Sequence, residues 1–435
     1  MVRRWPLCSS YAPVMVLTAK ETSLNGPKRR TVADVTFKGG LTEPFHRWFR
    51  LTPSFSPTLV ADWLASHPVV DGGVVLDPFS GAGTTCIVAS AQNMRSVGFE
   101  INPFLAFVGR VSTNWTIEPS ELSAIAALVL AEARQSVARL PAGIDDYCSA
   151  LKTTVPGIHN IGRWWRTEVL RELIGLRQAI RSHGANATDH LLLALAQCVY
   201  PTAEITLGRL QIAFKDRSSE DIDAFAFFQV ATEAMVEDLE NHRPTVGGSV
   251  EIINSDSRMM SELGATVGGV FCSPPYPNRY SYVWNTRPHL YLLELISTAR
   301  AAADIDCVTI GGTWGRATSD LQRATVEASA NVKTAIGGLL DRFSADDLLM
   351  RNYICKYFND LDSHLSALYS KLLPGSPLGY VVGNTETKGI MVQTQDILGQ
   401  LMDLNGLEKI EIEELRARNS GAGLVESTVS ARRPG

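Results

Sequence analysis

The stretch VVLDPFSGAGTT, residues 74–85, decides the fold class of this chain. Its β-branched start predicts a short buried strand over 74–76, its glycines predict a tight turn, and the following TTCIVASAQN predicts a helix. A second buried strand is predicted within SVGFEINP, residues 96–103, with the acid Glu100 at its tip. Strand, glycine turn, helix, strand and acid, in this order, indicate the start of a doubly wound, mostly parallel α/β sheet.

The glycine turn is also a candidate ligand site. Gly81 and Gly83 let the backbone pass close to a ligand, and the helix after them presents free N–H groups. No Gly-Lys-Ser/Thr follows, which excludes a Walker phosphate loop, and the third glycine of the nicotinamide fingerprint is absent. Glu100 follows about 20 residues later, where an acid accepts hydrogen bonds from ribose hydroxyls. A purely structural tight turn is the alternative.

The composition sets the broad class. The 435 residues suffice for one large domain with insertions or for two domains. With 45% hydrophobic and 20% charged residues the chain is typical of soluble globular proteins, and no apolar run approaches the length of a membrane span. The seven cysteines form no CxxC pair and no zinc-spaced cluster, so we expect no metal, no membrane and a cytoplasmic protein. The net charge of −5 still permits a local basic cleft.

The chain divides into four regions by pattern. Residues 1–40 lack periodicity and are interpreted as an N-terminal arm, and residues 41–119 hold the first predicted strands. Residues 120–245 carry apolar residues at spacings of three and four, which predicts a helical insertion and a possible DNA-binding region. Strand signals return in residues 246–435, around a further helical segment at 283–370.

A second candidate site lies at Ser273-Pro274-Pro275-Tyr276, directly after a predicted strand. Proline cannot donate to a sheet ladder, so the proline pair ends that strand. We interpret the loop as a rigid arc in which the Ser273 hydroxyl and a backbone carbonyl accept hydrogen bonds from an amino group. Tyr276 offers a flat face for stacking on an aromatic base. The alternative is a proline-rich strand exit with a surface tyrosine.

These motifs resemble those of AdoMet-dependent DNA amino-methyltransferases, in particular the enzymes acting on cytosine N4. DPFSGAGTT resembles the cofactor motif of that family, and SPPY resembles its catalytic motif, in which a leading serine is commoner among N4-cytosine enzymes. Softer matches are FHRWFRLTPSFSPTLVADWL, IINSDSR, PLGYVVGNTETKG and LRARNSGAGLVESTVS. A helical block of over a hundred residues between the two central motifs departs from the family pattern.

The resemblance implies a Rossmann-like methyltransferase fold with a large helical insertion. It implies methyl transfer from S-adenosyl-L-methionine (AdoMet) to the N4 amine of a flipped cytosine in double-stranded DNA, and a cognate restriction or defence system as a partner. The catalytic residues that it implies are Ser273, Pro274, Pro275 and Tyr276, with the Pro274 carbonyl as the second acceptor. The residues expected to bind AdoMet are Phe55, Asp77, Pro78, Phe79, Ser80, Gly81, Gly83, Thr84, Thr85, Glu100, Ile101, Asn102, Asp256 and Ser257.

DNA contacts are expected in two places. Next to the catalytic loop, Asn278, Arg279 and Tyr280 are placed to line the pocket or to wedge the flipped base. In NIGRWWRTEVLRELIGLRQAIRSH, arginines surround a tryptophan pair, which is typical of a surface for phosphates and an unstacked strand. An amphipathic helix with buried tryptophans is an equal alternative there. The candidate arginines and lysine of the helical region are Arg163, Arg166, Lys215 and Arg217.

Other functions remain open at this stage. The same loop chemistry suits adenine N6, because both bases present an exocyclic amine, and only the serine at position 273 favours cytosine. RNA guanine methylation is a more distant alternative, since no appended RNA-binding module is recognisable. A catalytically silent DNA-binding protein is a further alternative, and AdoMet binding would discriminate against it.

Overall fold

The computed structural model describes residues 30–206, 212–323, 325–418 and 421–435. Within these residues one sheet has the strand order β3-β2-β1-β4-β5-β9-β8. Strands β1 to β5 pair in parallel, and β9 runs antiparallel between β5 and β8. The predicted Rossmann-like, doubly wound and mostly parallel fold is confirmed. The strands are β1 (Val74–Asp77), β2 (Ser96–Phe99), β3 (Val250–Ile253), β4 (Val267–Cys272), β5 (Pro377–Gly383), β8 (Glu408–Ala417) and β9 (Val425–Arg432).

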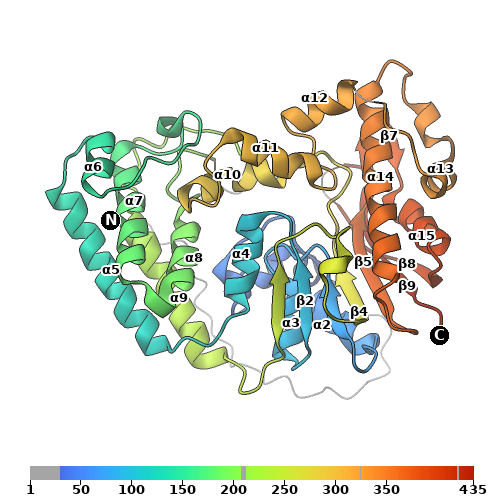
Figure 1. Cartoon of the computed structure of the whole chain (residues 1–435), viewed down its shortest axis with the longest axis horizontal. Helices are drawn as coiled ribbons and strands as arrows, with labels where there is room; N and C mark the ends of the chain where they lie inside the picture. Colours follow the sequence, from blue (N-terminus) through green and yellow to red (C-terminus); the bar gives the residue numbers. More distant parts are fainter. Residues whose placement is uncertain (1–29, 207–211, 324, 419–420) are drawn as a thin grey trace.

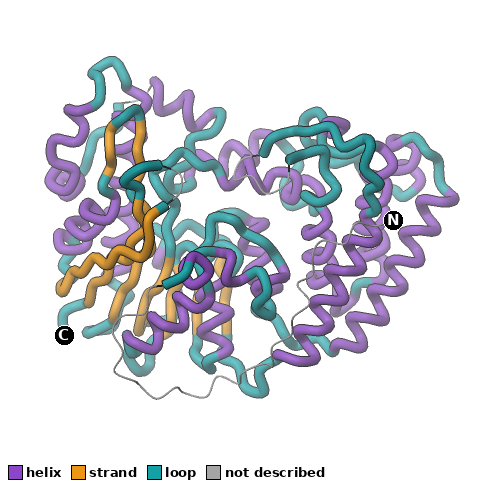
Figure 2. The backbone as a smooth tube through the Cα atoms, turned by 180° about the vertical axis from the view of Figure 1, so that it is seen from behind, coloured by secondary structure: helices purple, strands orange, loops and turns teal. Residues whose placement is uncertain are grey.

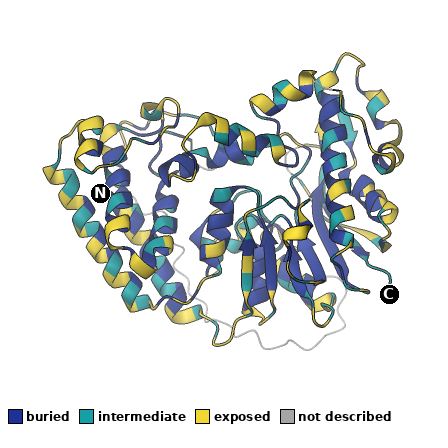
Figure 3. Ribbon diagram, in the orientation of Figure 1, coloured by how far each residue is buried: buried dark blue, intermediate teal, exposed yellow. Residues whose placement is uncertain are grey.

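The central strands are buried on both faces, as Figure 3 shows by their colour. Along β1, Val75 packs with Trp63 of α2, whereas Leu76 on the opposite face packs with Phe358 of α14. This alternation follows the two-residue period of a strand. The sheet therefore forms the middle layer of three. The helices packed around it include α2 (Pro57–Ser66), α3 (Thr84–Ala91), α4 (Pro103–Ser112), α13 (Ala330–Ile336), α14 (Leu348–Tyr369) and α15 (Thr394–Leu404).

Residues 119–242, between α4 and β3, form a separate helical block beside the sheet (Figure 1, Figure 2). Its longest helices pack on one another around an apolar interior, in which Trp164 and Trp165 are each only 1% exposed. α10 (Tyr282–Leu292) and α11 (Ala299–Val308) span the top of Figure 1 between this block and α12 (Arg316–Arg323). The helices of the block are α5 (Pro119–Arg139), α6 (Ile144–Ala150), α7 (Thr167–His183), α8 (Thr188–Cys198) and α9 (Ala224–His242).

One buried carboxylate ties the segment before α2 to the helical block. Asp238 of α9 is fully buried, and its Oδ2 accepts hydrogen bonds from the Phe45 backbone N–H at 2.9 Å and from Trp48 Nε1 at 2.9 Å. Its Oδ1 pairs with the Arg47 guanidinium at 2.6 Å. Phe45 adopts a positive φ of 65°, which the surrounding contacts hold in place. These contacts position residues 45–53 over the carboxyl edge of the sheet.

The sequence located most elements but not all of them. The strands predicted over 74–76 and within 96–103 are β1 and β2, the helix predicted after the glycine turn is α3, and the strand predicted before Ser273 is β4. The other strand signals of residues 246–435 correspond to β3, β5 and β9. β8 and the short hairpin β6 (Thr385–Thr387) with β7 (Ile390–Val392) were not predicted. Most of the predicted N-terminal arm, residues 1–29, lies outside the described residues, and the remainder holds α1 (Val32–Val35). In the described ranges, no helix combines the length and apolar character of a bilayer span.

Candidate active site

The glycine turn after β1 is folded by its own backbone and by a neighbouring strand. Asp77 Oδ1 accepts from the Phe79 N–H at 3.0 Å, and the Ser80 N–H donates to the Phe99 carbonyl of β2 at 2.9 Å. Gly98 allows this approach, because a Cβ there would lie 2.8 Å from Ser80 Cβ. Gly81 has φ of 52°, a conformation in which a residue with a side chain is strained. The turn is thus pressed against β2 at the carboxyl edge of the sheet.

Glu100 connects the loop after β1 with the loop after β2 at this edge of the sheet. Its Oε2 accepts from the Gly81 N–H at 2.8 Å, and its Oε1 accepts from the Asn102 N–H at 2.8 Å. Asn102 in turn caps α4 and donates to Thr286 Oγ1 of α10 at 2.8 Å. The acid that the sequence placed at the tip of β2 therefore reaches the glycine turn directly.

A cavity of about 650 Å³, hereafter the glycine-turn cavity, opens over this edge. Its wall includes Leu51 and Pro53 from the segment before α2, and Val308 to Ile310 after α11. The predicted AdoMet-binding residues that line it are Pro78, Phe79, Gly81, Glu100, Ile101, Asn102, Asp256 and Ser257.

Glu100, which lines this cavity, and Asp77, which lies behind the glycine turn, both have strongly altered acidity. Burial raises the pKa of Asp77 to about 7, and burial raises the pKa of Glu100 to about 7 against the opposing effect of its backbone hydrogen bonds. Asp77 is 1% exposed, and its Oδ2 has no hydrogen-bond partner among the described residues. No Lys, Arg or His of the described chain forms an ion pair with either group. Such carboxyl groups suit a ligand that brings positive charge and hydroxyl donors.

Asp256 lines the cavity but is already paired. Its oxygens accept from the Arg258 backbone N–H at 2.9 Å and from the Arg258 guanidinium at 2.5 to 3.0 Å. Arg258 also pairs with Asp360 and donates to the Val308 carbonyl. Asp256 was predicted to lie near the adenine of AdoMet. Its carboxylate is neutralised by Arg258, so it is not a free acceptor for that ligand.

Several predicted AdoMet-binding residues do not line the cavity, and each has a structural reason. Phe55 packs edge-on against Phe271 at 5.5 Å, inside the core. Gly83 caps α3 in the left-handed region, and a Cβ there would lie 3.2 Å from Gly109 Cα of α4. The remaining buried members of the predicted set, which support the turn from behind, are Asp77, Ser80, Thr84 and Thr85.

The loop after β4 presents acceptors toward the cavity. The Ser273 hydroxyl donates to the Val381 carbonyl of β5 at 2.9 Å, so its lone pairs are left to accept. Tyr357 of α14 donates to the Pro275 carbonyl at 2.7 Å. In the described part of the chain nothing donates to the Pro274 carbonyl. These contacts fix the loop from β5 and α14 while leaving a hydroxyl oxygen and a carbonyl with acceptor capacity.

Tyr276 is fixed at its hydroxyl and along its ring. Its hydroxyl donates to Glu426 Oε1 of β9 at 2.7 Å, and burial together with the Glu426 carboxylate raises its pKa well above the usual range, which keeps it protonated. A Cβ at Gly383 would lie 2.9 Å from Tyr276 Cε2, so the ring rests on bare backbone. Arg416 Nε pairs with the other Glu426 oxygen at 2.7 Å. The ring orientation is therefore set by β5, β8 and β9.

A second hollow, hereafter the tyrosine cavity, lies on the other side of Ser273 and encloses about 1030 Å³. Ser273, Pro53 and Tyr282 line both cavities, so the two spaces adjoin at the Ser273 hydroxyl. Asn278 and Tyr280, which were predicted to contact DNA, line the tyrosine cavity. Arg279 is exposed beside it with φ of 58°.

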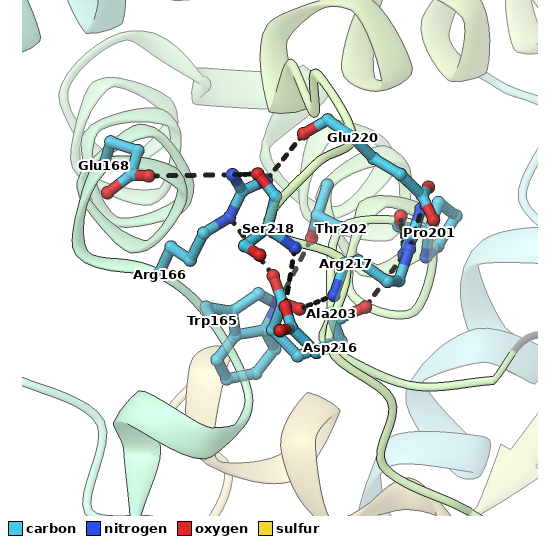
Figure 4. A network of polar contacts seen from close by, with 11 residues as sticks. Trp165, Arg166, Glu168, Pro201, Thr202, Ala203, Asp216, Arg217, Ser218 and Glu220 are labelled. Carbon is cyan, nitrogen blue, oxygen red and sulfur yellow. Dashed lines mark hydrogen bonds and ion pairs between the residues drawn. The ribbon is translucent and has the colours of Figure 1, made fainter.

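The arginines predicted to bind DNA in the helical block are largely committed within the protein (Figure 4). Arg217 is 7% exposed, donates to the carbonyls of Pro201 and Ala203, and pairs with Glu220 at 2.9 Å. Arg166 pairs with Glu204 at 3.1 Å. The alternative of an amphipathic helix with buried tryptophans describes this region, because guanidinium groups there satisfy buried carbonyls rather than face solvent.

Two of the candidates in this block remain exposed. Arg163 lies over the Phe214 ring at 4.0 Å, and Lys215 is 3.8 Å from Glu220. Their proposed contact with DNA stays a prediction.

Sequence reasoning missed three functional neighbours. Gly98 lies in a strand interior and carries no local signal except its own identity. His364 of α14 contacts the Ser257 carbonyl through Nδ1 and the Phe79 ring at 4.9 Å, and burial lowers its pKa to about 4, so it is neutral. Glu426 was quoted within a strand but given no role. Each contacts the site through a residue on a neighbouring strand or more than a hundred positions away, so no local sequence pattern identifies it. In the described ranges, no cluster of His, Cys, Asp and Glu has the geometry of a metal site.

Comparison with known proteins gives a local match. Residues 61–106, from α2 through the glycine turn and Glu100 into α4, match the model of the N6/N4 DNA methylase family. The type II methyltransferase M.BsoBI of Geobacillus stearothermophilus is 32% identical over 69 residues, which are 16% of this chain and 14% of the relative. The type II methyltransferases M.AvaI of Nostoc sp. (strain PCC 7120) and of Anabaena variabilis match with the same values. The chain thus spans 14% of the length of the curated relatives it matches.

A structural comparison finds the rRNA methyltransferase AviRa of Streptomyces viridochromogenes at 11% identity, over 87% of this chain and 86% of that one. The TM-score is 0.29, which is too low to support a conclusion. The sequence match is therefore the informative one. It covers the part of the cavity wall from Pro78 to Leu105, and over residues 61–106 this chain is similar to the N6/N4 DNA methylase family.

Proposed function

We propose that this protein transfers a methyl group from AdoMet to the N4 amine of a cytosine flipped out of double-stranded DNA. The observation that carries the proposal is the meeting of two cavities at Ser273. One cavity is lined by the family-matched turn and Glu100, and the other is lined by Tyr276. A methyl donor and an acceptor base held in these two spaces would meet at the serine.

The glycine-turn cavity fits AdoMet by the chemistry of its donor set. AdoMet brings an ammonium, a sulfonium and ribose hydroxyls, and the Glu100 carboxyl group on the cavity wall forms no ion pair within the described residues. Gly81 keeps this wall open, because a Cβ there would lie 3.0 Å from Leu51 Cδ2. When bound, AdoMet would supply an electrophilic methyl group carried on the sulfonium.

The loop after β4 would activate the amine. An exocyclic amine is a poor nucleophile because its lone pair is delocalised into the ring. Ser273 Oγ and the Pro274 carbonyl would accept its hydrogens, which favours a pyramidal nitrogen with its lone pair turned out of the ring plane. Tyr276 would hold the base by stacking, and the fixed geometry of the loop supplies orientation. The amine gains the methyl group and loses one proton, which can leave to water through the tyrosine cavity.

The direct test is methyl transfer from labelled AdoMet to mixed-sequence DNA, followed by nucleoside mass spectrometry. We expect N4-methylcytosine. N6-methyladenine would preserve the loop chemistry and overturn the choice of base. AdoMet binding without any methylated DNA would overturn DNA as the substrate. The pairing with a restriction or defence system is part of the same proposal, and it draws on the type II methyltransferases that the chain resembles.

AdoMet binding is expected to strengthen as pH rises through about 7. Glu100 on the cavity wall, whose pKa burial raises to about 7, becomes a carboxylate over this range and attracts the cationic ligand, and Asp77 behind the turn ionises over the same range. Calorimetric titration between about pH 5.5 and 8.5 would measure the affinity. Glu100→Gln should weaken binding and flatten the pH dependence. An affinity independent of pH in the wild-type protein would contradict this role.

Ionisation of the same two carboxyl groups, which strengthens AdoMet binding, lowers the stability of the folded protein. A carboxyl group whose folded-state pKa is raised contributes stability that is present below its ordinary pKa near 4 and is lost as pH rises through about 7. The ligand-free protein should therefore gain most from bound AdoMet above pH 7.

A further inference from the structure

The tyrosine cavity has a one-sided polar lining beyond Ser273. The side chains with formal charge on its wall are the cations Lys38, Arg416 and Arg418 and the single acid Glu426. Arg416 of β8 is paired with Glu426 of β9, and Arg418 lies two residues after Arg416, just beyond the end of β8. The end of β8 thus brings two guanidinium groups to the space that adjoins the catalytic loop.

The acid in this cavity is already saturated by internal partners. Glu426 Oε1 accepts from the Tyr276 hydroxyl, and Oε2 accepts from Arg416 Nε. The charged side chains of the wall are therefore left mainly with hydrogen-bond donors. A base whose amine lies at Ser273 would bind best here if the ring edge next to the amine carries hydrogen-bond acceptors.

Of the two arginines on this wall, Arg418 is the one that forms no ion pair within the described residues. Its Nη1 donates to the Asn384 carbonyl at 2.9 Å, and in the described residues no carboxylate forms an ion pair with it. Its guanidinium carbon lies 5.5 Å from the centre of the Tyr276 ring. A planar guanidinium offers several donors in a fixed fork, which matches paired acceptors better than a lysine ammonium does.

The two candidate bases differ on the edge that Arg418 would meet. Next to its N4 amine, cytosine presents the N3 and O2 acceptors side by side. Next to its N6 amine, adenine presents the N1 acceptor followed by a C–H group. With the amine at Ser273 and the ring on Tyr276, only cytosine offers a guanidinium fork two acceptors.

We propose that Arg418 determines base specificity by donating to N3 and O2 of the flipped cytosine. This inference rests on the proposed function and adds the group that selects the base. Glu426 would act as a positioning residue, because it holds both Tyr276 and Arg416 around the same space. Adenine would leave part of the fork unpaired in the cavity, which is unfavourable.

The test uses the full chain and a duplex containing the sequence that the wild-type protein methylates. The target cytosine is replaced in a second duplex by 3-deazacytosine, which keeps the amine and O2 but carries C–H at position 3. Single-turnover rates are measured for wild type, Arg418→Met, Arg418→Lys and the control Arg110→Met, whose side chain is exposed on α4. AdoMet affinity serves as the check that each variant is folded.

We expect the analogue to slow the wild-type protein and Arg110→Met by roughly 10- to 100-fold, the size of a lost bidentate base contact. Arg418→Met and Arg418→Lys should be slowed on cytosine by a similar factor and should show little further loss on the analogue. If both Arg418 variants keep the full analogue penalty, the specificity role is overturned while the proposed function stands. If the wild-type protein forms no N4-methylcytosine, the proposed function itself is overturned, and this role with it.

Discussion

Asp238→Ala is expected to lower the free energy of unfolding by about 3–5 kcal/mol, the cost of removing one partner from a buried ion pair. The substitution leaves the Phe45 N–H and Trp48 Nε1 buried without an acceptor and leaves Glu237 as the remaining carboxylate partner of Arg47. Unpaired buried donors are destabilising in their own right. Chemical denaturation followed by tryptophan fluorescence would measure the loss, since Trp48 is 1% exposed and reports on this region.

Glu237→Ala is the matched control, because Glu237 pairs with the same Arg47 from the adjacent position of α9. Its side chain is 45% exposed, so its removal should cost less than about 1 kcal/mol. Equal losses for the two variants would show that the buried hydrogen bonds of Asp238 are not what holds the segment. Because residues 45–53 carry Leu51 and Pro53 to the glycine-turn cavity, Asp238→Ala should also weaken AdoMet binding.

The parts of the fold that could be predicted are those whose signals are local in the sequence. The turn at Gly81 is specified by its own glycines and by the strand before it, and the proline pair at 274 and 275 ends β4 by removing its donors. Glu100 could be placed at the tip of β2 because the strand and the acid are adjacent. In each case the residues that decide the structure lie within one short segment.

The residues that could not be predicted depend on pairing between distant segments. Glu426 reaches Tyr276 only because β9 inserts between β5 and β8, an arrangement that no local pattern encodes. Arg217 was a candidate for DNA contact, yet its guanidinium is buried against the carbonyls of Pro201 and Ala203 and the Glu220 carboxylate. Gly83 was assigned to the cofactor, whereas its missing side chain serves the contact with α4. The sequence shows which side chains are charged, but it does not show whether they point toward solvent or into the protein.

In the helical block, too, the contacts between distant segments could not be predicted from the local pattern. Its periodicity predicted helices correctly, and its core places both Trp164 and Trp165 inside. Arginines that follow them in α7 donate to carbonyls near helix ends, as Arg177 does toward the Leu292 carbonyl at 2.9 Å. A mixture of arginine and tryptophan is therefore compatible with either a solvent-facing or a buried arrangement, and only the tertiary contacts distinguish them.

Ser273→Ala is expected to slow methyl transfer by roughly 10²- to 10³-fold, the effect of removing one preorganised hydrogen-bonding group at a reacting centre. The hydroxyl proton is committed to the Val381 carbonyl, so Oγ can serve the amine only as an acceptor, and alanine deletes that acceptor. AdoMet affinity should change little, because the rest of the glycine-turn cavity is untouched. Single-turnover rates with AdoMet saturating, together with calorimetric AdoMet affinity, separate the two effects.

Ser255→Ala provides the comparison for this experiment, since Ser255 lines the glycine-turn cavity but not the tyrosine cavity. It should leave the rate at saturating AdoMet within a few-fold of wild type, with any effect confined to AdoMet affinity. A Ser273→Ala protein that transfers methyl groups at the wild-type rate would exclude Oγ as an acceptor for the amine. The Pro274 carbonyl would then have to act alone, and the meeting of the two cavities at Ser273 would no longer support the proposed reaction.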